Sequence, residues 1–184
     1  MSYGILLLRV VLGSIMAAHG AQKLFGWFGG GGSRGTAAGF AQLRFRAPLL
    51  MALAAGLAEL GGGLLIAAGL LTPLAALAIA VVMLNAIGTV HWRNGFFNSA
   101  GGYEFNLLVL AAAAAIAATG AARFSLDNLI GWADNISGLL WGIGVIAVSA
   151  LVSAVTLTLG RRSSEERGVP MPENSRAEAA QRAA

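Results

Sequence analysis

The residue best placed to do chemistry is Glu59, a carboxyl in the middle of an otherwise apolar run. The run extends from Ala47 to Leu71 (APLLMALAAGLAELGGGLLIAAGLL) and contains no other ionisable side chain. A charged carboxyl near the centre of a bilayer-length helix costs about 3 kcal/mol or more, so such a residue is usually paired or functional. Glu59 is therefore the first candidate for a proton-handling or ligand-binding group.

Further polar residues fall at similar depths in neighbouring apolar stretches. At about 1.5 Å per helical residue, His19 lies roughly 13 Å inside Phe28, and Glu59 lies roughly 16 Å beyond Pro48. Lys23 shares a helix face with His19, because residues four apart stack on a helix. One half of the membrane holds the whole set, which is His19, Lys23, Glu59, Asn85, His91, Glu104 and Asn106. We expect a polar pocket that is lined by the first four helices and open to the cytoplasm, in which His19 pairs with Glu59 and Lys23 with Glu104.

A structural role for the same residues is the alternative. Contacts of glutamate with histidine or lysine can hold helices together without any catalytic task. Lys23 can also act as a boundary anchor whose ammonium reaches water. The depths of His19 and His91 differ by roughly 12 Å, which is too far for both to ligate one haem iron.

Other cofactor classes lack their ligands in this sequence. The chain has no cysteine, which excludes thiolate chemistry, iron–sulfur ligation and covalent haem attachment within it. No cluster with metal-ligand spacing occurs, so we predict no haem, iron–sulfur or metal site.

Five apolar stretches must position these residues. The 184 residues are 57% hydrophobic and 11% charged, too little charge to cover the surface of a soluble domain. Each stretch approaches the length needed to cross about 30 Å of hydrocarbon. We predict an all-α integral membrane protein, with helices over 4–28, 47–71, 73–92, 103–120 and 138–160. The first stretch lacks a basic region before it, and Arg9 interrupts it, so we expect a mature helix rather than a cleaved signal.

Loop charges predict the orientation. Arg34, Arg44, Arg46, Arg93 and the basic residues after Gly160 fall on one side, whereas Arg123 is alone in the loops of the other. The positive-inside rule then puts the N-terminus outside and the C-terminus in the cytoplasm. The net charge of +4 is thus a topology signal, and no nucleic-acid partner is expected.

Turns and small residues complete the expected architecture. Thr36–Arg46 is predicted to be either a short interfacial helix or an ordinary loop, and Thr72 is predicted to cap the helix that begins at Pro73. Ala58 and Gly62 form a small-xxx-small pair beside Glu59, where a neighbouring backbone can approach. The domain boundaries expected are a four-helix bundle (1–130), an additional helix (131–160) and a disordered tail (161–184).

Four segments together resemble the DoxX family of small bacterial membrane proteins. They are LLLRVVLGSIMAAHGAQKLFG, AGLAELGGGLLIAAGLLTPLAA, NGFFNSAGGYEFNLLVLAAA and ARFSLDNLIG, and they span about residues 4–130. The resemblance implies a four-helix membrane bundle in a bacterial cell membrane. It also implies functional roles for Arg9, His19, Lys23, Glu59, Glu104 and Asn106. The helix over 138–160 and the charged tail depart from the family pattern.

Members of that family are similar to the small subunit of a thiosulfate–quinone oxidoreductase, and some associate with soluble redox enzymes. The resemblance therefore implies a membrane subunit of an oxidoreductase system with quinone as cofactor. His19 and Glu59 would be its catalytic residues, and Arg9, Lys23, Asn85, Glu104 and Asn106 would contact the cofactor. Lipid, soluble redox enzymes and further copies of the chain are the expected partners. A small-solute or proton-coupled transporter and a non-catalytic scaffold remain alternatives.

Overall fold

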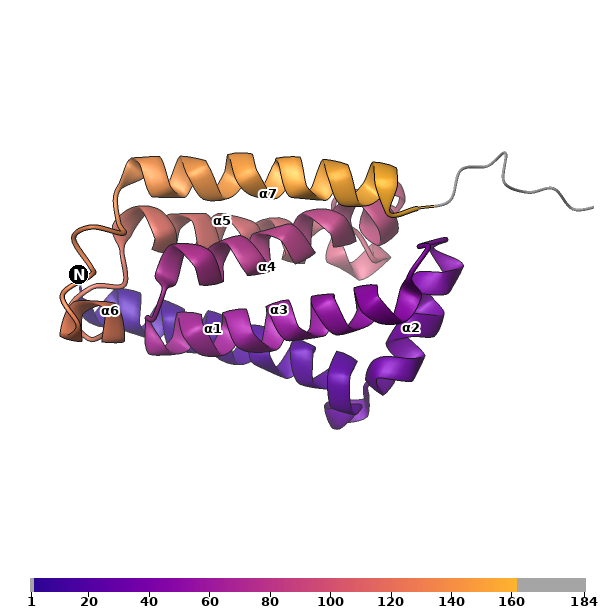
Figure 1. Ribbon diagram of the computed structural model, residues 1–184, viewed down its shortest axis with the longest axis horizontal. Helices are drawn as coiled ribbons and strands as arrows, with labels where there is room; N and C mark the ends of the chain where they lie inside the picture. The colour runs from indigo at the N-terminus through magenta and orange to yellow at the C-terminus, as the bar shows by residue number, and fades with distance from the viewer. Residues whose placement is uncertain (1, 162–184) are drawn as a thin grey trace, which may run out of the picture.

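Five long helices form an antiparallel bundle in the computed structural model, which describes residues 2–161 (Figure 1). They are α1 (Ser2–Phe25), α3 (Pro48–Ala68), α4 (Thr72–Ala86), α5 (Glu104–Thr119) and α7 (Leu139–Leu159). All five lie within a few residues of the stretches predicted from hydrophobicity. The expected disorder of 161–184 concerns a segment that, apart from Arg161, is outside the described residues.

Short elements lie at the two ends of the bundle. One end, called the α2 end below, holds η1 (Trp27–Gly29), α2 (Gly32–Gln42), η2 (Ile87–His91), η3 (Trp92–Asn94) and η4 (Asn98–Ala100). The opposite end, the α6 end, holds the N-terminus, the α3–α4 turn and α6 (Leu126–Leu129). Helix α2 lies across the ends of α1 and α3 (Figure 1). Of the two alternatives for Thr36–Arg46, the structure shows a helix, although it begins at Gly32 and ends at Gln42.

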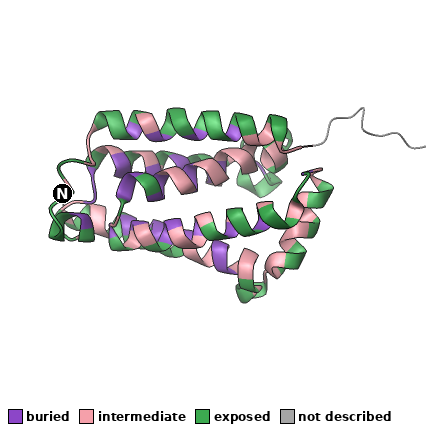
Figure 2. Ribbon diagram, in the orientation of Figure 1, coloured by how far each residue is buried: buried purple, intermediate pink, exposed green. Residues whose placement is uncertain are grey.

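Four helical segments are long and apolar enough to cross a membrane: α1, α3, Thr72–Asn94 and α7. The 16 residues of α5 extend about 24 Å, somewhat less than the hydrocarbon thickness. Figure 2 shows that most of α7 is exposed, and many of its exposed residues are large and apolar, as they are on the other long helices. Such a surface suits contact with lipid tails. The chain is a multi-pass membrane protein.

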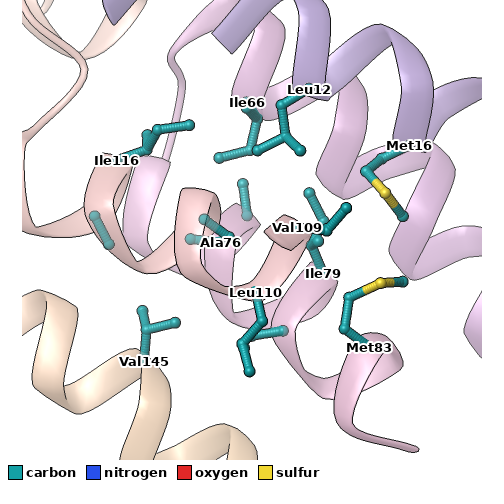
Figure 3. Packing of buried hydrophobic residues seen from close by; sticks show 14 residues of the cluster. Leu12, Met16, Ile66, Ala76, Ile79, Met83, Val109, Leu110, Ile116 and Val145 are labelled. Carbon is teal, nitrogen blue, oxygen red and sulfur yellow. The ribbon is translucent and has the colours of Figure 1, made fainter. Parts of the chain in front are cut away.

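The apolar core lies where α1, α3, α4, α5 and α7 meet (Figure 3). Met16, Ile66, Ile79 and Ile116 are completely buried there. Many of the remaining contacts use alanine and glycine, which let helices approach closely when no hydrophobic effect drives them together in lipid.

Glycines fix how α1 and α3 are turned toward each other. A Cβ on Gly13 would lie 2.4 Å from Gly63 O, and one on Gly20 would lie 2.3 Å from Leu60 N. Gly62 instead faces α4, where a Cβ would lie 3.2 Å from Ala75 O. The close approach predicted beside Glu59 is confirmed for Gly62, and the glycines of α1 extend it to Gly63.

The start of α4 differs from the prediction. Leu71, not Thr72, is the N-cap residue, and it has a left-handed backbone with φ 49°. The carboxylate of Asp127 accepts hydrogen bonds from Leu71 N (2.8 Å), Thr72 N (3.1 Å) and Thr72 Oγ1 (2.6 Å). A carboxylate from a distant segment thus satisfies two amides at the start of α4, which are not the amides that an N-cap Thr72 hydroxyl would have accepted from.

Candidate functional site

The candidate site centres on an ion pair between Lys23 of α1 and Glu59 of α3. Lys23 Nζ donates a short hydrogen bond to Glu59 Oε1. The Glu59 side chain is 2% exposed, whereas that of Lys23 is 30% exposed. A buried carboxylate of this kind is stabilised chiefly by its partner, because the apolar interior solvates a lone charge poorly.

One oxygen of the Glu59 carboxyl is open to a further hydrogen bond. Its Oε2 atom is buried and has no hydrogen-bond partner among the described residues. An ionised carboxylate can accept several hydrogen bonds, and a buried acceptor left empty is costly. The site can therefore accept one further donor at Oε2, or a proton.

The tight contact between α1 and α3 helps to explain why the pair differs from the one predicted. Gly13 and Gly20 face α3, so Lys23, three residues after Gly20, also faces α3. His19 is turned toward α5, where its ring lies 5.8 Å from that of Phe105. The predicted pairing of His19 with Glu59 is therefore wrong.

The two helices are also shifted along their axes relative to each other, which is a second reason why Lys23 rather than His19 meets Glu59. Helix α1 ends at Phe25 rather than Phe28, and a Cβ on Gly56 would contact Leu24 and Lys23. Lys23 is thus level with Gly56, and its side chain extends inward to reach Glu59. Depths counted separately from each helix end could not reveal this offset.

Glu104 does not pair with Lys23 as predicted. It is exposed at the start of α5, where its Oε2 accepts a hydrogen bond from Asn98 N at 2.9 Å. The carboxylate thus holds the connection between η4 and α5 in place.

Asparagines of the predicted set lie at other helix contacts. Asn106 is buried, and its Nδ2 lies 3.5 Å from Met83 Sδ between α5 and α4. Asn85 Nδ2 donates to Val81 O (2.9 Å) and to Ser153 Oγ of α7 (3.2 Å). Asn85 therefore links α4 to α7.

Arg9 lies at the opposite end of the bundle, close to α6. Its guanidinium donates to Ile66 O (3.1 Å), Ala67 O (3.1 Å), Phe124 O (2.9 Å) and, at short range, Ala121 O. Two of these carbonyls belong to the last turn of α3, where a cation is favourable. Arg9 thus holds the segment after α5 against α3.

Two residues that hold these segments in place, Thr36 and Asp127, were not predicted from the sequence. Thr36 of α2 donates from Oγ1 to Lys23 O at 3.2 Å, so α2 contacts the turn that bears Lys23. Asp127 has its role only because the segment after α5 folds back to α4. The sequence gives no local signal for Thr36, whereas Asp127 lies within the ARFSLDNLIG segment that resembles the family.

Acid–base chemistry and hydrogen bonding are what the pair can offer. Lys23 presents an ammonium donor, and Glu59 presents an open carboxylate oxygen beside it. Within residues 2–161, no three histidine, aspartate or glutamate side chains gather closely enough to hold a metal ion.

Comparison with known proteins agrees with the resemblance. The DoxX family model matches residues 4–92, which include both members of the ion pair. A protein of Bacillus subtilis (strain 168), named "Putative oxidoreductase CatD", is 33% identical over 127 residues, covering 69% of this chain and 87% of that protein. No solved structure matches the chain. On this similarity, the chain belongs to the DoxX family.

Proposed function

We propose that this chain is the membrane subunit of an oxidoreductase system, and that the Lys23–Glu59 pair binds a quinone headgroup and moves its protons. The observation that carries the proposal is the buried Glu59 Oε2, which has no donor within the described structure. The oxidoreductase name of the similar Bacillus protein supports the reaction class.

The residues of the pair fit the two forms of such a headgroup. A quinone supplies two-electron, two-proton redox chemistry when it is bound. The Lys23 ammonium would donate to a ring carbonyl, and Glu59 Oε2 would accept from a ring hydroxyl.

Proton movement would use the difference in exposure between the two side chains. Glu59 Oε2 would accept the proton that a ring hydroxyl releases. Lys23 loses its counter-charge when Glu59 is neutral, but its partial exposure lets water solvate the ammonium. The pair can therefore alternate between charged and neutral carboxyl without stranding a buried cation.

Electrons must come from elsewhere in the system. The chain contains no cysteine, so it cannot ligate an iron–sulfur cluster through thiolates. A soluble redox enzyme docked at the membrane is the donor or acceptor that we propose, and the cytoplasmic side is its proposed location.

Quinone content and turnover test the proposal. The protein is purified with its native lipids, and bound quinone is extracted and quantified. We expect Glu59→Gln to lower bound quinone and quinone-dependent turnover in membranes at least tenfold. Asp134→Asn, the same chemical change in an exposed loop at the α6 end, should leave both unchanged. Absence of quinone from the wild-type protein, together with unaltered turnover in Glu59→Gln, would refute the proposal.

A further inference from the structure

Lys23 lies in the last turn of α1, where its main-chain carbonyl has no helical partner. Gly26 N donates to Gln22 O at 3.2 Å, and the chain then leaves the helix because Gly26 adopts a left-handed backbone with φ 76°. No main-chain amide of the described residues donates to Lys23 O. Carbonyls in the last turn of a helix need a partner from outside it. The position of Lys23 therefore depends on what that partner is.

Helix α2 supplies the partner. Thr36 Oγ1 donates to Lys23 O at 3.2 Å. The connection between α1 and α2 follows the same turn, since Gln22 Nε2 donates to Phe28 O at 3.1 Å and a Cβ on Gly30 would lie 2.5 Å from Gln22 O. Figure 1 shows α2 lying across the ends of α1 and α3. The main chain at Lys23 is thus held by α2.

Helix α2 is itself weakly held in the fold. Its 11 residues include Gly32, Gly35 and Gly39, and none of the 11 is buried. Glycine destabilises a helix relative to alanine, and a segment with little buried surface opens more easily than the core. The chain bends through left-handed residues on both sides of α2, at Gly29 (φ 79°) and Arg44 (φ 69°). We expect α2 to move more readily than the long helices.

Movement of α2 would act directly on the ion pair. The Lys23 side chain begins beside Gly56, where a Cβ would lie 3.4 Å from Lys23 Cβ, and reaches Glu59 from that point. Without Thr36, the last turn of α1 loses the partner of its carbonyl, and this starting point is no longer fixed. The Lys23 side chain is 30% exposed, so its ammonium can leave Glu59 for water.

We propose that Thr36 is a positioning residue, and that α2 controls through it whether Lys23 is held on Glu59. With α2 in place, the ammonium stays at the carboxylate and is ready to donate to a quinone carbonyl. With α2 displaced, the ammonium is released toward water. The consequence for turnover rests on the proposed quinone reaction, whereas the position of Lys23 can be measured without quinone.

Amine labelling measures the position of Lys23 directly, because Lys23 is the only lysine in the chain. The full-length protein in neutral detergent is treated with a water-soluble N-hydroxysuccinimide ester, and the modified Lys23 peptide is quantified by mass spectrometry. Thr36→Val keeps the shape of the side chain but removes the hydroxyl. It should speed labelling about fivefold, which is the effect of one hydrogen bond.

Two further variants are matched controls for the lost hydroxyl. Thr36→Ser keeps the hydroxyl, so it should label at the wild-type rate. Thr158→Val makes the same chemical change at the same end of the bundle, where the exposed Thr158 Oγ1 donates to Ala154 O within α7. It should leave the labelling rate unchanged.

Stabilising α2 should have the opposite effect. A Cβ on Gly35 or on Gly39 would meet no atom within 4 Å, so both positions have room for alanine. The double change Gly35→Ala and Gly39→Ala should slow the labelling of Lys23 about threefold, because alanine favours the helix.

Steady-state kinetics connect the position of Lys23 to turnover. Thr36→Val should raise the KM for quinone about fivefold with kcat little changed, since Lys23 contacts the bound ring, and Thr36→Ser should restore it. Faster labelling of Thr36→Val with unaltered kinetics would support the positioning role and count against the quinone reaction. The inference is overturned if Thr36→Val and Thr36→Ser label alike, or if stabilising α2 leaves the labelling rate unchanged.

Discussion

The Lys23–Glu59 pair lets a carboxylate persist inside the membrane. Glu59 is almost completely buried, and its nearest described counter-charge is the ammonium of Lys23. Breaking one side of a buried pair leaves the other charge without compensation, which is worse than losing both. The two side chains should therefore behave as a unit when either is changed.

This coupling predicts a non-additive stability pattern. Lys23→Met should destabilise the protein by on the order of 3 kcal/mol, since it strands the Glu59 carboxylate. Adding Glu59→Met should recover most of that loss, because two apolar side chains of similar size need no solvation. Thermal unfolding in detergent, followed by tryptophan fluorescence, measures both effects.

Arg93→Met is the matched control for this prediction. Arg93 is an exposed cation at the same end of the bundle, so its loss should change stability by less than about 0.5 kcal/mol. Additive effects of the two methionine substitutions would contradict the proposed coupling.

Arg9 acts through geometry rather than through charge alone. All of its described hydrogen bonds go to main-chain carbonyls, which a planar guanidinium can reach simultaneously. Arg9→Lys should therefore destabilise the protein by about 3 kcal/mol, as several bonds from a charged donor are lost.

Hydrogen exchange can locate that loss. Amides of residues 121–130 should exchange faster in Arg9→Lys, because this segment loses its attachment to α3. Arg123→Lys, an exposed arginine of the same segment, should leave exchange unchanged. Equal protection in the Arg9→Lys and Arg123→Lys variants would remove the proposed anchoring role.

At the scale of helices, the contact between α1 and α3 determines where the polar side chains meet. A Cβ on Gly63 would lie 2.5 Å from Ala17 N, whereas one on Gly61 would meet no atom within 4 Å. We expect Gly63→Ala to destabilise by about 1–3 kcal/mol through overpacking against the backbone. Gly61→Ala should be neutral or stabilise by up to about 1 kcal/mol, because alanine favours helix.

Both substitutions lie on the same helix, so they share any general effect of adding a methyl group. Unfolding midpoints of the two variants in one detergent give the comparison. A similar loss in both would mean that the close approach of α1 to α3 does not exist.

The lengths of the apolar stretches were sufficient to predict the long helices, but not where their polar side chains meet. The stretch 47–71 predicted α3, which covers Pro48–Ala68, because burial in lipid requires a continuous apolar run. His19 and Lys23 are four residues apart, so they lie within about 40° of each other on α1 and differ mainly by one turn in depth. The tight contact at Gly20 helps to set which of them reaches Glu59. No pattern local to α1 or α3 contains that information.

Long-range capping is the second feature that local patterns could not predict. Thr72 next to Pro73 is typical of a helix start, and α4 does begin there. The cap comes from Asp127, 55 residues later, since the segment after α5 returns to the α3–α4 turn. The resemblance to the DoxX family covered that segment but gave no contact for it.

At the scale of the whole molecule, α7 is an integral part of the bundle. It packs on α4 and α5, and it is tied to the α2–α3 connection by Arg46 and Gly160. Ser153 and Gly142 face inward, where Gly142 lies against Ala118. The described bundle therefore has five helices, and the first and the last of them begin at the same end.

Arginine distribution over the two ends predicts the orientation in the membrane. The α2 end carries Arg34, Arg44, Arg46, Arg93 and Arg161, whereas the α6 end exposes Arg123 and uses Arg9 internally. Because the translocation machinery retains positively charged loops, the α2 end should face the cytoplasm.

The absence of cysteine makes this orientation directly measurable with single engineered thiols. In intact cells, a membrane-impermeant maleimide should label Leu129→Cys, which is exposed in α6, and should spare Ser99→Cys, which is exposed in η4. Both thiols should react after the cells are opened. Labelling of Ser99→Cys but not Leu129→Cys in intact cells would invert the topology, and it would place the exposed end of Lys23 on the outer side of the membrane.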